Sequence, residues 1–245
     1  MRTAGVLMIV ALLGAGPAAA DYREATVTNG AKIVGQVRVT GDVPALPPQP
    51  VFKQTETCGT ELPDERLVVG KSGVLKNATV SIVNITSGKP PRLAEPVKLD
   101  NVKCAFVPHV LTATVGQTLQ IHNSDPFLHD AHALLGSKTL FNVGILSNRS
   151  VLEPLLEPGL IRINCNVRHT WMHAYVYVSD NPYHAVTDAD GHFVLDDVPP
   201  GNYTIRVWHE LLGSQDREVK VLAGETSTQE VTFSAAAPPS APEAH

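Results

Sequence analysis

The chain has 245 residues, a formal net charge of −5 and 5% aromatic residues, and its 18 Gly and 19 Pro separate short stretches of Val, Ile, Leu and Thr. This mild acidity gives no indication of a nucleic acid or an anionic membrane as a partner. The composition favours a sandwich of many short strands over a helical protein. The length suits one large β domain or two small ones.

The first 20 residues are typical of a secretory signal. Arg2 precedes the apolar run Val6–Leu13, and Ala18 to Ala20 provide a small-residue cleavage site before Asp21. The apolar run is too short to cross a bilayer, so we expect no membrane span once the signal is removed. The sequence therefore predicts a periplasmic or secreted protein.

Residues 21–90 are predicted to form an N-terminal β segment. Lys32–Val39 alternates between apolar and polar residues and predicts a strand, and Ala78–Val83 predicts a second strand with alternating faces. Between them, residues 51–75 are expected to be a loop with short β pieces, including Arg66–Val69. Prolines at positions 90, 91 and 96 then indicate a boundary.

Residues 97–180 contain a regular series of short apolar segments separated by turn signals. Eight such segments in succession favour a Greek-key sandwich. The predicted strands are Cys104–Val107, Leu111–Val115, Thr118–His122, His129–Leu134, Leu140–Val143, Ser150–Leu156, Leu160–Asn164 and Ala174–Val178.

The segment between the last two of these strands holds three metal-ligand candidates within eight residues: Cys165, His169 and Met172. A thiolate, an imidazole and a thioether on one loop, completed by a distant histidine, are the ligands of a mononuclear copper site of the blue-copper type. His129 is the preferred upstream histidine because it directly follows a polar turn. His122 and His132 are its rivals.

The chain contains three cysteines. If Cys165 is a metal ligand, Cys58 and Cys104 remain as a pair, and an exported protein lies in an oxidising compartment. A disulfide between these two is the simple inference.

The segment Phe106–Pro108, the turn Asn123–Pro126 with His129, and the Cys165, His169, Met172 series together resemble the cupredoxin family. The resemblance implies one copper ion held by these four ligands. Small cupredoxins such as amicyanin have two residues between the cysteine and the histidine, whereas here Arg168 makes that gap three. The binuclear CuA loop has this longer gap but carries a second cysteine where this chain has Ile161, so a mononuclear centre is favoured.

Asn123 and Asp125 are turn formers by residue type. The resemblance also implies a role behind the ligands, in which an asparagine at this position ties the ligand loop to the histidine-bearing segment. His109, His132 and His173 have no assigned role.

Residues 184–233 resemble the carboxypeptidase regulatory-like domain, which is similar to transthyretin and is grouped with the carbohydrate-binding-like folds. Its usual opening strands would be Lys32–Val39 and Ala78–Val83, far upstream. We therefore expect an all-β protein in which the copper sandwich is inserted into, or packed beside, this smaller sandwich. The layout resembles methylamine-utilisation-type periplasmic proteins. Residues 234–245 are expected to be a disordered tail.

The favoured function is electron transfer with a periplasmic dehydrogenase or cytochrome as partner. The alternative is a non-redox binding module in which the carbohydrate-binding-like domain is active and the copper loop is vestigial or stores copper. An enzyme is disfavoured because the sequence has no His-x-His pair for a second copper centre and no serine-hydrolase or zinc-protease motif.

Overall fold

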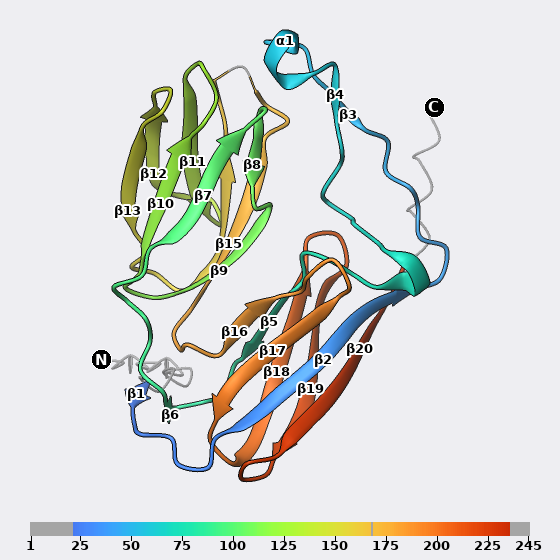
Figure 1. Ribbon diagram of the computed structural model, residues 1–245, viewed down its shortest axis with the longest axis vertical. Helices are drawn as coiled ribbons and strands as arrows, with labels where there is room; N and C mark the ends of the chain where they lie inside the picture. The colour runs from blue at the N-terminus through green and yellow to red at the C-terminus, as the bar shows by residue number, and fades with distance from the viewer. Residues whose placement is uncertain (1–21, 168, 236–245) are drawn as a thin grey trace, which may run out of the picture.

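The computed structural model describes residues 22–167 and 169–235 and confirms the all-β fold class. Two sandwiches dominate it, each with its own cluster of buried apolar residues (Figure 1). Among the described residues, no helix is long and apolar enough to cross a membrane. The predicted signal sequence and residues 236–245 of the predicted tail lie outside the described part of the chain.

The first sandwich consists of a four-stranded and a five-stranded sheet. The four-stranded sheet has the order β13 (Ser150–Pro154), β10 (Thr118–Asn123), β7 (Val97–Val102), β8 (Ala105–Val107). The five-stranded sheet has the order β12 (Lys138–Ile145), β11 (His129–Leu135), β14 (Gly159–Asn164), β15 (His173–Ser179), β9 (Val110–Thr114). Parallel pairing of β7 with β10 and of β9 with β15 shows that the connections cross between the sheets.

Period-two alternation explains why these segments form strands with one buried face. Ile161 and Ile163 of β14 are fully buried, and Leu119 and Ile121 of β10 are buried in the same cluster. Among the strands of the first sandwich, β7 alone was not predicted from the sequence. That strand contains Lys98, Asp100 and Asn101, residue types that are uncommon in strands, although Leu99 between them is buried.

The second sandwich pairs early strands with late ones. One sheet has the order β16 (His184–Val186), β5 (Thr79–Ile82), β18 (Gly201–His209), β19 (Gly213–Val221), and the other has the order β17 (His192–Val198), β2 (Ala31–Thr40), β20 (Thr226–Ser234). The first half of β19 is mostly polar and exposed, and β20 includes Ser234, which was expected to belong to the disordered tail.

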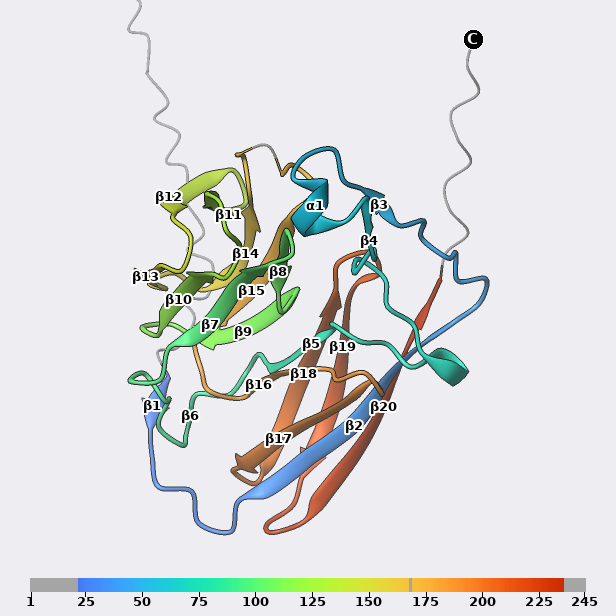
Figure 2. The same ribbon diagram turned by 45° about the horizontal axis from the view of Figure 1, so that its top comes forward.

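A long excursion between β2 and β5 leaves the second sandwich and reaches the end of the first (Figures 1 and 2). It contains β3 (Gln49–Pro50), α1 (Thr55–Cys58), β4 (Glu61–Leu62) and the 3-10 turn η1 (Lys71–Gly73). The predicted strand Arg66–Val69 is wrong: only Val69 makes an isolated bridge, to Leu75. Apart from this bridge and the short β3–β4 pair, the described excursion consists mainly of turns and irregular chain.

The predicted disulfide between Cys58 and Cys104 is confirmed, and their Cα atoms are 5.3 Å apart. Cys58 ends α1, and Cys104 lies in the turn between β7 and β8. Both side chains are buried in the core of the first sandwich. The disulfide therefore fastens the excursion to the sandwich that carries the candidate ligands.

Replacing both Cys58 and Cys104 by serine should lower the free energy of unfolding by about 3 kcal/mol, because the disulfide closes a loop with a sequence separation of 46 residues. Denaturant unfolding of the double variant against the parent measures this. Thr57→Ser, beside Cys58 on α1, is the control that should leave the midpoint unchanged. Equal unfolding midpoints for the double variant and the parent would contradict the expected effect.

Candidate metal centre

Three predicted ligands meet at one end of the first sandwich. His129 is the first residue of β11, Cys165 directly follows β14, and His169 lies in the loop before β15. The Sγ atom of Cys165 is 3.7 Å from Nδ1 of His129 and 3.8 Å from Nδ1 of His169. All three side chains are buried, with exposed fractions of 1% or less. The fold thus brings together residues that are 36 positions apart in the chain.

The remaining imidazole nitrogens each have an acceptor. Nε2 of His129 is 2.9 Å from Oδ2 of Asp125, and Nε2 of His169 is 2.9 Å from Oε1 of Gln54. Because a carboxylate and an amide oxygen only accept hydrogen bonds, each Nε2 carries its proton. In a neutral imidazole with this tautomer Nδ1 carries the free lone pair, and in both residues it lies next to the Cys165 sulfur.

The donor set fits a small thiolate-binding metal ion. Bonds of about 2.0 Å to nitrogen and about 2.3 Å to sulfur, opened to about 120°, separate sulfur from nitrogen by about 3.7 Å. The two sulfur–nitrogen distances match this value. Two imidazoles and one thiolate in a trigonal arrangement are the equatorial ligands of copper sites that transfer electrons.

Burial and hydrogen bonds shift the pKa values of Cys165, His169 and Asp125. Burial raises the pKa of the Cys165 thiol to about 11, so a metal ion binding here displaces a proton. Burial and the neighbouring His129 lower the pKa of His169 to about 4, so its imidazole is neutral at pH 7. Burial acts to raise the pKa of Asp125, but hydrogen bonds from His129 and two backbone amides hold it below its ordinary value.

Met172 is buried beside these residues, with an exposed fraction of 2%, in the same apolar cluster as Cys165. Its backbone closes the loop: its N–H donates to the carbonyl of His169, and its carbonyl accepts from the N–H of Cys165. The side chain also lines a cavity of about 40 Å³. The Met172 side chain is therefore buried in the core of the first sandwich.

Asp130, which the sequence analysis missed, fixes the ligand loop to β11. Its Oδ1 accepts hydrogen bonds from the backbone N–H groups of Asn166 and Val167, at 2.6 and 2.9 Å. The resemblance had implied this role for Asn123. The Asn123 amide instead donates to the carbonyls of Phe127 and Ile145, which stabilises the turn ahead of His129. A buried aspartate inside a predicted strand was the available signal for Asp130.

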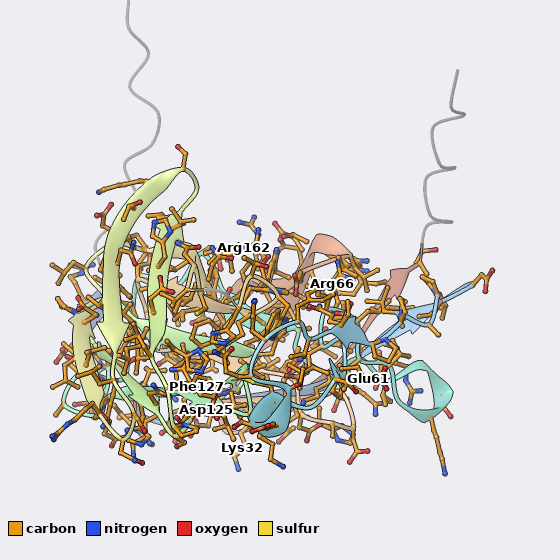
Figure 3. All side chains as sticks on the ribbon, turned by 90° about the horizontal axis from the view of Figure 1, so that it is seen from above. Lys32, Glu61, Arg66, Asp125, Phe127 and Arg162 are labelled. Atoms are coloured by element: carbon orange, nitrogen blue, oxygen red, sulfur yellow. A yellow bond between two sulfur atoms is a disulfide. The ribbon has the colours of Figure 1, made fainter. Side chains whose placement is uncertain are left out.

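Three further side chains surround the histidines. Phe127 packs against both rings, with centroid distances of 5.2 Å to His129 and 5.5 Å to His169, and lies next to Asp125 in Figure 3. Trp171 donates its indole N–H to the carbonyl of Cys104. Gln54, contributed by the excursion, has a φ of 51°, which costs a residue of its type about 1 kcal/mol. No pattern in the sequence pointed to Gln54.

The rival histidines lie elsewhere. His122 is hydrogen-bonded to Ser150 on the four-stranded sheet. His132 lies between Asn166 and Thr139, with both ring nitrogens in hydrogen bonds. Neither belongs to the group of close donor atoms formed by His129, Cys165 and His169.

Asp130→Ala should lower the free energy of unfolding by about 3 kcal/mol, because it leaves two amides near the buried cysteine without their charged acceptor. Asp188→Ala is the matched control. Its Oδ1 also accepts two backbone N–H groups, from Asp190 and His192, but the side chain is 59% exposed, so water replaces it. Denaturant unfolding that gives equal losses for the two variants would contradict the role assigned to Asp130.

Comparison with known proteins gives partial matches. The family model of the carboxypeptidase regulatory-like domain matches residues 172–234. That match includes β15, which the structure pairs with β14 and β9 in the first sandwich, whereas the second sandwich resumes at β16. A search of curated proteins finds no match.

Among solved structures, one similar chain is the copper-containing nitrite reductase of Thermus scotoductus, with 24% identity and a TM-score of 0.32 over 34% of this chain and 22% of that chain. Another is a purple cupredoxin from Nitrosopumilus maritimus, with 22% identity and a TM-score of 0.31 over 34% of this chain and 99% of that chain. The oxidised P96G mutant of amicyanin is similar as well, with 21% identity and a TM-score of 0.31 over 34% of this chain and 82% of that chain. The chain therefore spans about a fifth of the nitrite reductase. It carries a match to the carboxypeptidase regulatory-like domain, and its neighbours among solved structures include cupredoxins.

Proposed function

We propose that the chain is an exported electron-transfer protein that binds one copper ion through His129, Cys165 and His169, with Met172 as the weak axial ligand. One observation carries the proposal: the Nδ1 atoms of His129 and His169 converge on a buried thiol, at 3.7 and 3.8 Å. Copper would supply a one-electron couple between its cuprous and cupric states.

The chain's own residues support this chemistry by holding the ligands in place. Asp125 and Gln54 orient the two imidazoles through their Nε2 atoms, which is the usual function of partners behind metal-bound histidines. Asp130 and the loop hydrogen bonds restrain Cys165 and Met172. Phe127 and the buried surroundings exclude water. A site restrained in this way changes little in geometry between oxidation states.

The proposal extends to compartment and partner. A cleaved signal at residues 1–20 would deliver the protein to the periplasm or the medium, where a dehydrogenase or a cytochrome would exchange electrons with it through a small, weakly binding surface. We assign the protein no catalytic residue. We also propose residues 97–180 as the copper domain, inserted between β5 and β16 of the regulatory-like domain. In support of this, each set of strands has its own buried cluster.

Loading residues 21–245 with Cu(II), followed by removal of loose metal, should give an intense thiolate-to-copper absorption band and one copper per chain. Visible and electron paramagnetic resonance spectra, with copper analysis, measure this. Absence of the band, with Cys165 reacting as a free thiol, would overturn the copper proposal. It would favour the alternative of a non-redox binding module with a vestigial or copper-storage loop.

Ligand variants test the roles separately. Cys165→Ala should remove the band, because no other thiolate is available, and His129→Ala should weaken copper binding. Met172→Leu should keep a coloured centre with an altered reduction potential, since the axial ligand tunes the potential. His132→Ala, on the same strand as His129, is the matched control and should keep the parent spectrum. A band that persists in Cys165→Ala would exclude this ligand set.

A further inference from the structure

A second group of metal-binding side chains lies between the two sandwiches. His109 directly precedes β9, and His173 begins β15, the parallel neighbour of β9, so the two imidazoles project from adjacent strand ends. Their ring centroids are 5.0 Å apart. Glu210 comes from the turn between β18 and β19 of the other sandwich. The group therefore joins residues that are more than 100 positions apart in sequence.

The three side chains converge through their donor atoms. Oε2 of Glu210 is 2.8 Å from Nε2 of His109, and Oε1 is 3.0 Å from Nε2 of His173. One donor atom from each residue lies within 4.8 Å of the others. The side-chain exposed fractions are 5% for His109, 11% for His173 and 9% for Glu210. A buried carboxylate with two imidazoles is a typical ligand set for zinc.

Both ring nitrogens of His173 face acceptors, so either a second ring proton or a metal ion at one nitrogen satisfies them. Its Nδ1 is 3.2 Å from the carbonyl oxygen of Trp171, and its Nε2 faces the Glu210 carboxylate. Both partners accept hydrogen bonds, while a neutral imidazole has one N–H group. A metal ion at Nε2 with the Nδ1 proton on a backbone carbonyl satisfies all of these groups, and metal-bound histidines are commonly held in this way.

One side of the group faces a pocket. A pocket of about 450 Å³ borders His173 and Glu210 and is also lined by Arg66, Arg162 and Tyr175. Water or a small anion can reach the group from this pocket and occupy a fourth coordination position.

We propose that His109, His173 and Glu210 form a second metal site, separate from the copper ligands, that binds one Zn²⁺ ion and crosslinks the two sandwiches. Two neutral imidazoles and one carboxylate leave a single positive charge, which the open pocket side balances with water or an anion. The site shares none of the four proposed copper ligands, although His173 directly follows Met172.

The test uses the mature chain with Cys165→Ser, so that the thiolate of the copper centre is absent. The protein is first stripped of metal and then loaded with Zn²⁺. It should retain one zinc per chain through gel filtration, and zinc should raise its melting temperature. Titration against a chromophoric chelator measures the affinity. Glu210→Gln should bind zinc at least 10-fold more weakly, since loss even of a residue behind the ligands weakens metal binding 10-fold or more. Glu218→Gln, on β19, is the matched control and should bind as the parent does.

Absence of retained zinc in the Cys165→Ser protein would overturn the proposal, as would equal affinity in Glu210→Gln. If Glu210→Gln fails to fold, His109→Gln provides the same comparison from the other sandwich. Zinc-edge X-ray absorption of the loaded protein should show two imidazole ligands. A spectrum with sulfur or with oxygen alone would also overturn the assignment. Failure here leaves the copper band unaffected, so the two proposals are tested separately.

Discussion

The arrangement of the candidate copper centre depends on two buried carboxylates. Asp125 accepts hydrogen bonds from the Nε2–H of His129 and from the backbone N–H groups of Lys103 and Cys104. Asp130 accepts two N–H groups of the loop that follows Cys165. A buried carboxylate is costly unless it is fully hydrogen-bonded, so each of these holds its partners tightly in place. Together they fix the imidazole and the thiol before any metal binds.

Cys104 connects this framework to the rest of the protein. Its sulfur is bonded to Cys58 of the excursion, its N–H donates to Asp125, and its carbonyl accepts from Trp171 of the ligand loop. Gln54, which belongs to the same excursion, is hydrogen-bonded to Nε2 of His169. A segment that belongs to neither sheet of the first sandwich thus supplies a hydrogen bond to a candidate ligand, from a residue four positions before the disulfide.

Several specific side-chain contacts cross the boundary between the two sandwiches. Tyr177 and Ser81 form a hydrogen bond across it, and Tyr175 packs edge-on against Trp208. Next to these contacts Glu210 meets His109 and His173. Because His173 directly follows Met172, the interface lies within one residue of the candidate axial ligand. The position of the second sandwich therefore bears directly on the loop that holds the proposed copper ligands.

By itself, the sequence determined the all-β class, most strand positions and the disulfide, because period-two alternation and the cysteine count are local or countable properties. It also singled out the Cys165, His169, Met172 series, since these three lie on one loop. It missed β7, Asp130, Gln54 and the Glu210 cluster. Nothing in a local pattern tells which strand Asp130 faces or that Gln54 reaches His169 across 115 positions. Only the packing of segments far apart in sequence decides these contacts.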